Sequence, residues 1–407
     1  MRKEITLLIL VTVALLLAGT LTILSISTIR DIALKKIQRE APEKTQTLVE
    51  NQEKKLEIPV IYKHAVYLLI GAIAFLIMVH FDYHHLAEKR VLLPALVVMT
   101  ILLLLTFVPP LGGKINGAYR WLTLGPLSFQ PSELAKFVLV AWLAVRLTIH
   151  QDKIDHFKHG FIMPFAMAGF FVAIIVAQKD IGIPFVMLVA TFAMVWVAGG
   201  QKRYLLGSCA LCAVAGIILI IFQPYRLDRI WALLNPWKYR ETIGFQLIQS
   251  LVALSQGGLW GRGPGAGEQK LGYLPAADTD FIFATYGEEF GLFGTVLMIS
   301  LFVAMLYFAL RISANAPDLF GALIAVGITI LLLVQAVFII AVTVGLAPTK
   351  GLPLPFVSYG GSALTVSLMM MGVLVNIGIR GEMERSADKQ PLTFTPWRTM
   401  LRPRRAW

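Results

Sequence analysis

The sequence predicts an all-α membrane protein, a polytopic bundle of about ten transmembrane helices with a large extracytoplasmic loop before the eighth helix. Hydrophobic residues make up 57% of the 407 residues and charged residues only 15%, whereas about a quarter of the residues in a soluble protein are charged. Apolar runs of about 18 or more residues, the length that crosses a bilayer, recur along almost the whole chain. So much apolar surface requires lipid as its solvent, which excludes a soluble fold.

Ten apolar runs define the expected spans. The first run follows Arg2 and Lys3 as a signal peptide would, but it is as long as a membrane span and no small-residue cleavage site follows it. We therefore expect it to be retained as a helix. The expected spans are 5–27, 64–82, 92–109, 133–149, 161–178, 181–199, 204–222, 285–311, 319–346 and 362–380.

An even number of spans places both termini on one side of the membrane. Arg and Lys are equally numerous on the two sides, but two long outer segments hold most of the outer ones, and the positive-inside rule applies to short loops. The segments on the side of the termini are more basic per residue, which favours cytoplasmic termini. The net charge of +12 suits anionic lipid headgroups or a polyprenyl phosphate better than nucleic acid, although most of these cations need only orient the helices.

The remaining segments complete a single transmembrane domain over 1–380. Segment 28–63, the first extracytoplasmic segment, is rich in Lys and Glu at a spacing that suits a solvated helix, and we assign it no catalytic role. Segment 223–284, the large extracytoplasmic loop, is dense in Trp, Tyr, Arg, Gly and Asp without simple repeats, and a loop of that length is usually functional. The basic segment 381–407 is expected to be a cytoplasmic tail, disordered or on the inner membrane surface.

The only two cysteines, Cys209 and Cys212, lie inside the apolar run 205–222. No other Cys or His lies nearby in the sequence to complete a zinc site. We expect both to be small apolar helix residues. Because the chain has no other cysteine, we expect no disulfide outside the membrane.

Polar stretches interrupt the apolar pattern at four places. In the first, residues 117–136, Ser132 can cap a helix that starts at Glu133, which puts Glu133 and Lys136 on one helical face. This pair is either an ion pair at the start of the helix or part of a polar floor under a cavity. In the second case Arg120 and Lys136 would offer charge to a phosphate.

The second stretch, residues 178–182, is a polar turn between two spans in which Lys179 precedes Asp180. An ionisable residue near the bilayer core is costly and usually lines a cavity. The pair is therefore either a turn at the outer interface or the lining of a cavity.

The third stretch, residues 273–289, carries Asp278 and Asp280 where the long outer loop re-enters the membrane. A carboxylate beside Phe281, Ile282 and Phe283 is partly desolvated, which raises its pKa and makes it a better base. The alternative is a cap for the next helix.

The fourth stretch, residues 351–362, has prolines followed by paired glycines, which prevent a regular helix. Its exposed backbone amides can bind oxyanions. Irregular backbone at membrane depth is tolerated only where it lines a cavity or is buried in protein.

At these residues the chain resembles the SEDS family (shape, elongation, division and sporulation), the peptidoglycan polymerases of the FtsW and RodA type. The match covers spans three to ten in the family's order, which makes it highly specific. The stretches GPLSFQPSELAK and QKLGYLP are more similar to the division member than to the elongation member. The matching text is RWLTLGPLSFQPSELAK, YRLDRIWALLNPW, GFQLIQSLVAL, QKLGYLPAADTDFIFATYGEEFGLFG and GLPLPFVSYGGS.

The resemblance implies ten transmembrane helices and an inverting glycosyltransferase that polymerises lipid II at the outer face of the cytoplasmic membrane. In that reaction the 4-hydroxyl of one lipid-linked disaccharide attacks the anomeric carbon of another. Undecaprenyl pyrophosphate leaves, and the α-linked donor becomes a β-1,4 glycan. Such a site needs a base for the hydroxyl and positive charge for the leaving pyrophosphate.

The resemblance also implies roles for individual residues. Asp280 matches the essential aspartate of the family's TDF motif and is the expected catalytic base. Asp180 and Asp278 are expected to modulate it. The resemblance suggests a divalent cation, Mg²⁺ or Mn²⁺, although the sequence shows no ligand cage. The expected contacts to substrate or pyrophosphate are Arg120, Glu133, Lys136, Arg226, Arg229, Ser358, Gly360 and Gly361.

The chain departs from the family pattern at four positions. Asp278 stands where the family usually has histidine, so two carboxylates lie two residues apart and either raise the pKa of one of them or hold a cation. The other departures are Lys179 in place of a proline, Ile339 where asparagine is common and Ala363 in place of a second serine.

The expected partners are lipid II, a class B penicillin-binding protein that supplies transpeptidation, and other division proteins. Three alternatives stay open, namely an elongation polymerase of the RodA type, a lipid II flippase and a scaffold in the division complex. A flippase would need polar residues spread through the spans to both faces, whereas here they cluster outside.

Overall fold

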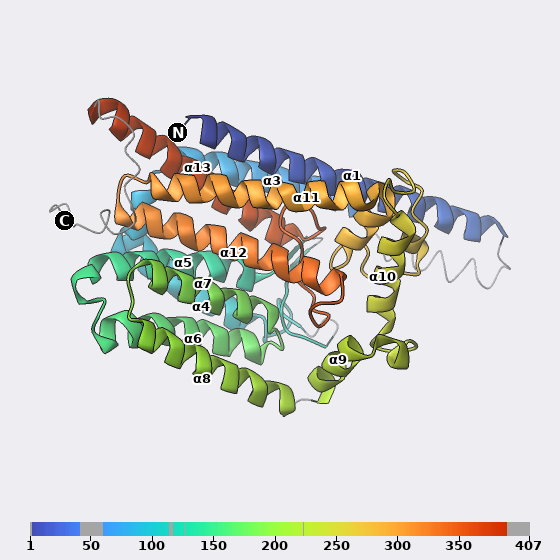
Figure 1. Cartoon of the computed structure of the whole chain (residues 1–407), viewed down its shortest axis with the longest axis horizontal. Coiled ribbons are helices and arrows are strands. Elements are labelled where there is room, and N and C mark those ends of the chain that lie inside the picture. Colours follow the sequence, from blue (N-terminus) through green and yellow to red (C-terminus); the bar gives the residue numbers. More distant parts are fainter. Residues whose placement is uncertain (1, 41–59, 114–116, 126, 223, 389–407) are drawn as a thin grey trace.

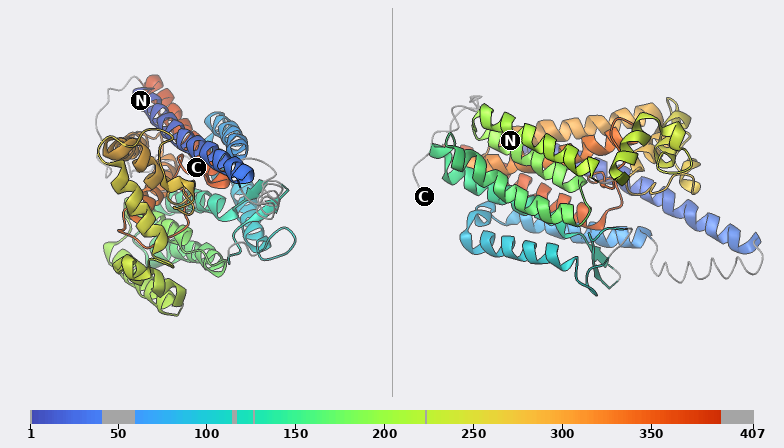
Figure 2. Two further views of the ribbon diagram at one scale, coloured as in Figure 1. Left: turned by 90° about the vertical axis from the view of Figure 1, so that its right-hand side faces the viewer. Right: turned by 90° about the horizontal axis from the view of Figure 1, so that it is seen from below.

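The computed structural model describes residues 2–40, 60–113, 117–125, 127–222 and 224–388. Helices dominate this part of the chain, and the long ones run side by side as a bundle (Figures 1 and 2). Each of the ten expected spans coincides with one long helix. These helices are α1 (Arg2–Glu40), α3 (Val60–His80), α4 (Lys89–Leu105), α5 (Pro131–Ile149), α6 (Met163–Ala177), α7 (Gly182–Val197), α8 (Lys202–Ile221), α11 (Ile282–Ala314), α12 (Leu319–Thr343) and α13 (Gly361–Asp388).

Among the described residues, six helices are long and apolar enough to cross a membrane: α1 over Arg2–Ile29, α3, α6 with the turn before it, α11, α12 and α13. The polytopic all-α class is therefore confirmed, whereas the crossings by α4, α5, α7 and α8 stay predictions. One departure from pure helix is a two-stranded antiparallel hairpin of β1 (Leu122–Leu124) and β2 (Leu127–Phe129).

The bundle has a buried centre and an apolar outer surface. In α12 and α13, 67% and 83% of the most apolar window is buried, because these two helices pack among the others. Helix α8 instead exposes large apolar side chains such as Leu206 and Leu211, which supports its predicted place in lipid. Both cysteines lie on this helix and are free, as expected.

The two described ends of the chain lie together. Arg2 at the start of α1 forms an ion pair of 2.8 Å with Glu382 near the end of α13. Helices α11 and α12 each run the length of the bundle (Figure 1). The loop between them therefore lies at the same end as Arg2, and the loops before α11 and after α12 lie at the opposite end. The start of α1 and the end of α13 therefore lie at the same end of the bundle, as an even number of spans requires. That both termini lie in the cytoplasm stays a prediction.

Several predicted boundaries move. Helix α1 continues to Glu40, so the first part of segment 28–63 is helical, whereas 41–59 lies outside the described residues. The expected tail 381–407 begins inside α13, and 389–407 also lies outside them. Segment 223–284 is more ordered than a loop, with short 3-10 turns at Pro236–Tyr239 and Gln269–Leu271 and two further helices, α9 (Pro224–Leu234) and α10 (Phe245–Gly257).

The predicted cap of α5 is wrong. The helix starts at Pro131 with Gln130 as its N-cap, so Ser132 lies in the first turn and accepts a 3.2 Å hydrogen bond from the Gln130 side chain. Proline suits this first position because it lacks an amide hydrogen there and its φ is already helical. The predicted pairing of Glu133 with Lys136 on one face is confirmed, with 2.7 Å between the charged atoms.

Candidate active site

Four loops and α9 meet at the end of the bundle opposite the termini. They are the hairpin region 117–125 and 127–130, the turn 178–181, the segment 272–281 before α11, and the segment 344–360 between α12 and α13. Backbone bonds join neighbouring loops: the amide of Tyr119 donates to the carbonyl of Gln178, and that of Tyr359 to the carbonyl of Asp278. The second, third and fourth polar stretches of the sequence therefore form one surface, together with part of the first stretch.

Asp280 is the centre of this surface. The pKa of its carboxyl is raised to about 7, chiefly by burial and then by the negative charge of Asp278, and Arg229 and Arg120 oppose the rise. Within the described residues its carboxylate accepts no hydrogen bond, so both oxygens are available to a ligand. A carboxylate that titrates near neutrality and has free oxygens is suited to accept a proton from a hydroxyl.

Gly351 leaves space beside this carboxylate. A Cβ added there would lie 3.2 Å from Oδ2 of Asp280, which is tighter than an ordinary van der Waals contact. The glycine therefore keeps the approach to the carboxylate open on the side of segment 344–360.

Neighbouring residues fix the backbone on either side of Asp280. The Ser358 hydroxyl donates to the carbonyl of Thr279 at 2.5 Å and accepts from the amide of Leu354 at 2.8 Å. The N-cap of α11 is Phe281, whose side chain makes no capping hydrogen bond, and the Asp280 carboxylate does not cap the helix either. Ser358 is used to hold the loop, rather than left open to a ligand.

The turn 178–181 brings a cation and a carboxylate to the same surface. Nε of Arg120 lies 3.5 Å from Oδ2 of Asp180, and Nη2 donates to the carbonyl of Lys179 at 2.5 Å. Asp180 is buried and its other oxygen accepts from the amide of Gly182 at 2.9 Å, whereas Lys179 is exposed. Asp180 therefore holds Arg120 in place near Asp280.

Helix α9 supplies two more cations. Nη1 of Arg229 donates a hydrogen bond to the carbonyl of Thr349, the residue before Lys350. Arg226 is buried, and burial lowers its pKa. Arg229 therefore reaches segment 344–360 from α9, and Arg226 lies one turn before it on the same helix.

Lys350 belongs to this group, and we did not predict it from the sequence. Its pKa is lowered to about 8, chiefly by burial and then by the charge of Arg229, against an opposing effect of Asp180. Arg226 and Arg120 also act on it, so all three arginines lie within electrostatic reach of Lys350. The sequence does carry a signal for Lys350. It is a single lysine directly before GLPLP, in a segment that is otherwise without charge.

Glu133 and Lys136 are not brought to this surface. Both are buried, and Nζ of Lys136 also donates to the side chain of Gln335 at 2.7 Å. Gln335 in turn donates to the carbonyl of Pro353 at 2.7 Å. The pair is thus an ion pair at the start of α5, as one of the two alternatives held, but it is buried rather than at the interface, and Gln335 links it to segment 344–360. Because Lys136 is buried, it has no open face for a phosphate.

The paired glycines have a packing role. A Cβ added to Gly361 would lie 2.4 Å from the ring of Tyr67, and one added to Gly360 would lie 2.9 Å from Pro353. The Tyr67 hydroxyl also donates to the carbonyl of Ser128 at 2.8 Å. Whether the backbone here also binds an oxyanion stays a prediction.

In the part of the chain that the structure describes, no group of three or more His, Cys, Asp or Glu side chains could hold a metal ion. The carboxylates at the surface face arginines and a lysine instead. The described residues therefore do not form a metal cage of their own.

Fold and site together define a polytopic, all-α membrane protein that holds a desolvated carboxylate among several cations at one end of its bundle. The chain belongs to the FtsW/RodA/SpoVE family, described as cell cycle protein, whose model matches residues 44–382. The resemblance seen in the sequence is thereby confirmed.

Among curated proteins, the chain is 44% identical over 319 residues to the probable peptidoglycan glycosyltransferase FtsW of Geobacter sp. (strain M18), covering 78% of this chain and 86% of that protein. It is 40% identical over 310 residues to stage V sporulation protein E of Bacillus subtilis (strain 168), covering 76% and 84%.

Two solved structures share the fold. One, described as "Structural coordination of polymerization and crosslinking by a peptidoglycan synthase complex", aligns with a TM-score of 0.64 at 25% identity over 88% of this chain and 97% of that chain. The rod shape determining protein RodA of Thermus thermophilus aligns with a TM-score of 0.58 at 24% identity over 88% and 95%.

Proposed function

We propose that this chain is a peptidoglycan glycosyltransferase that polymerises lipid II into β-1,4 glycan strands during cell division. The observation that carries the proposal is the raised pKa of Asp280, about 7, at a site surrounded by arginines and a lysine. The names of the relatives support the same activity, and FtsW in those names supports the division role over elongation.

In the proposed reaction, Asp280 takes the proton from the 4-hydroxyl of the acceptor sugar. The hydroxyl oxygen attacks the anomeric carbon of the donor from the face opposite the pyrophosphate. The bond from that carbon to the phosphate oxygen breaks, and the α-linkage becomes β. The chain's part is to remove one proton and to stabilise the negative charge that develops on the leaving pyrophosphate.

The cations of the site suit the leaving group. Arg120 is held by Asp180, and both Arg120 and Arg226 lie within electrostatic reach of Lys350. Guanidinium groups pair well with phosphate oxygens because two N–H groups match two oxygens. Lys136 is left out of this role, since it is buried against Glu133.

A divalent cation stays part of the proposal. Mg²⁺ often binds through one or two carboxylates together with substrate phosphates, and Asp278 and Asp280 are the side chains that would contribute. Removal of divalent cations with EDTA, followed by readdition of Mg²⁺ or Mn²⁺, tests this by the rate of glycan formation. A rate that EDTA leaves unchanged would remove the cation from the account.

We place the protein in the cytoplasmic membrane with both termini inside, so that the Asp280 surface faces outward, where lipid II is polymerised. The synthase complex among the structural neighbours supports a partnership with a class B penicillin-binding protein. Other division proteins are further expected partners.

Replacement of Asp280 by Asn separates this function from a flippase and a scaffold. Purified protein in vesicles is given lipid II, with and without its cognate penicillin-binding protein, and glycan chains and translocation of lipid II are measured on one sample. We expect polymer from the wild type and from Asp152→Asn, an exposed control, and none from folded Asp280→Asn. Translocation by a wild type that makes no polymer would favour the flippase.

A further inference from the structure

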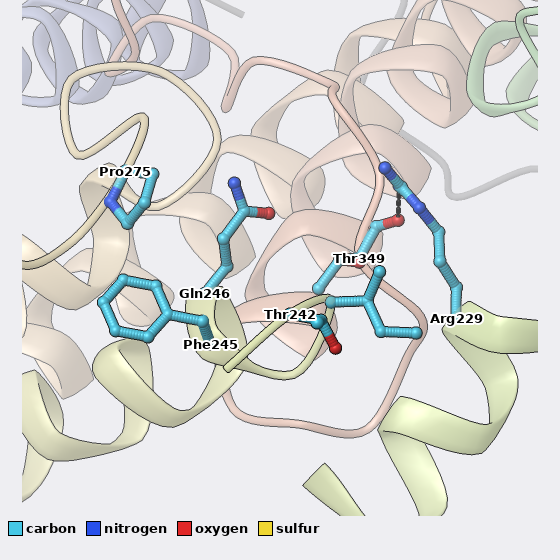
Figure 3. A pocket seen from close by; sticks show the side chains of 7 residues that line it. Arg229, Thr242, Phe245, Gln246, Pro275 and Thr349 are labelled. Atoms are coloured by element: carbon cyan, nitrogen blue, oxygen red, sulfur yellow. Dashed lines mark hydrogen bonds between the residues drawn. The ribbon is translucent and has the colours of Figure 1, made fainter. Parts of the chain in front are cut away.

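A cavity of about 450 Å³ lies beside the Asp280 surface, between the start of α10, the loop before α11 and the segment after α12 (Figure 3). Two of its residues, Phe245 and Gln246, come from the stretch GFQLIQSLVAL, which has no role in the reaction proposed above. The lining includes Arg229, Thr242, Phe245, Gln246, Pro275 and Thr349.

Gln246 presents an unused polar group to this cavity. Its side chain points toward the space between Pro275 and Thr349 (Figure 3). It is half-buried, and within the described residues its amide makes no hydrogen bond. Such an amide has two donors and an acceptor to offer, and a partly buried polar group without a protein partner needs a ligand or water.

The rest of the lining is nearly free of charge. Phe245 and Pro275 form an apolar wall, and Thr242 adds a hydroxyl that donates to the carbonyl of Tyr239 at 3.3 Å and can still accept a hydrogen bond. Of the described residues that line the cavity, none is a carboxylate and Arg229 is the one cation, already bound to the carbonyl of Thr349. An amide, a hydroxyl and an aromatic ring suit a neutral ligand with hydroxyl and amide groups, such as an N-acetylated sugar, better than a diphosphate.

The cavity adjoins the Asp280 site. Arg229 lines it and also acts on the charge of Asp280. Thr349 lines it as well and is two residues from Gly351, which lies against the Asp280 carboxylate. A sugar in the cavity would therefore extend toward the proposed base.

We propose that this cavity binds the terminal N-acetylated sugar of the acceptor, with the Gln246 amide bonded to the acetamido group. The inference rests on the proposed function. The donor's reacting sugar carries a diphosphate and therefore belongs beside Arg120, Arg226 and Lys350. The acceptor's attacking sugar is separated from its own diphosphate by a second sugar, so its site needs no cation of its own.

The first test measures binding without turnover. N,N′-diacetylchitobiose is titrated into full-length Asp280→Asn protein in nanodiscs and followed by saturation-transfer NMR. A second Asp280→Asn protein carries Gln246→Leu, and a matched control carries Gln249→Leu, one turn along α10 and outside the cavity lining. Cellobiose, which lacks the acetamido groups, is the matched ligand.

We expect Gln246→Leu to weaken binding of the chitobiose about tenfold, the control to bind as its parent does, and the parent to bind cellobiose about tenfold more weakly. Equal binding by the parent and Gln246→Leu would overturn the proposal. So would the absence of any binding to the parent at a probe concentration of about 10 mM.

A second test uses turnover of lipid II by the otherwise wild-type enzyme. Gln246→Leu should raise KM about tenfold and leave kcat within about twofold, because the contact is made before and during the reaction alike. An unchanged KM would overturn the sugar cavity and leave the glycosyltransferase in place. If the wild type makes no polymer, the proposed function fails, and the binding test still decides whether the cavity takes the sugar.

Discussion

The hydroxyl of Ser358 donates a 2.5 Å hydrogen bond to the carbonyl oxygen of Thr279, the residue directly before Asp280, across 79 positions of sequence. The amide of Tyr359 donates to the carbonyl of Asp278, the residue before Thr279, at 2.8 Å. The backbone that carries the proposed base is therefore held by the segment between α12 and α13. Ser358, expected from the sequence to contact substrate, is placed to position the base.

Ser358→Ala should lower the rate of glycan formation about tenfold and leave the KM for lipid II nearly unchanged. The substitution removes the bond to Thr279 and leaves the amide of Leu354 without its acceptor, which costs about 1–3 kcal/mol of stability. Steady-state kinetics and thermal unfolding measure the two effects. Ser358→Thr keeps the hydroxyl and should recover most of the rate, and full activity of the alanine variant would contradict the positioning role.

Asp278→Asn should move the acid limb of the rate profile to lower pH. Asp280 acts as a base when deprotonated, so the rate rises as the pH passes its pKa of about 7. Asp278 contributes to that raised pKa, so the neutral amide lets Asp280 deprotonate at lower pH. The rate of glycan formation is measured from pH 5 to 9 for both proteins, and a limb that stays where it was would rule out the coupling.

Lys350 should set the alkaline limb of the same profile. Burial and neighbouring arginines lower its pKa to about 8, so its positive charge is lost as the pH rises through that value. Lys350→Met should reduce kcat about 100-fold at neutral pH, if the lysine stabilises the leaving pyrophosphate. Lys350→Arg keeps the charge at all these pH values, so its alkaline limb should move to higher pH. A Met variant with wild-type kcat would remove Lys350 from the site.

Lys136→Met should destabilise the protein by about 3–5 kcal/mol, because it leaves the buried carboxylate of Glu133 without its partner. The double variant Glu133→Gln with Lys136→Met removes both charges and should recover most of the stability and the activity. Thermal unfolding in detergent and the rate of glycan formation are the measurements. If the double variant folds as well as the wild type yet makes no polymer, Lys136 contacts the pyrophosphate after all.

Much of the fold could be predicted from the sequence, because each span carries its own apolar signal. All ten expected spans coincide with helices, with boundaries that moved by a few residues except at the ends of α1 and α13. The cap of α5 was misplaced because Gln130, Pro131 and Ser132 all allow a helix start, and proline at the first position decides it.

The site could be predicted only in part, because its contacts join distant parts of the chain. Asp280 was expected beside apolar residues, and its burial bears out the expected desolvation. The pairing of Glu133 with Lys136 followed from helical spacing, but its closure by Gln335 depends on packing between α5 and α12. Lys350 was missed because the pattern around it is otherwise apolar, and only the folded structure places it near Asp180.

The rate of glycan formation against pH for the wild type and Asp280→Asn tests the central claim most directly. Both proteins are purified with the cognate penicillin-binding protein and given lipid II, and a folded Asp280→Asn is confirmed by its thermal unfolding. The account predicts a wild-type rate that rises through pH of about 7, and a variant rate lower by a factor on the order of 10³ and flat in this range. A variant that keeps the wild-type rate and its acid limb would show that Asp280 is not the base.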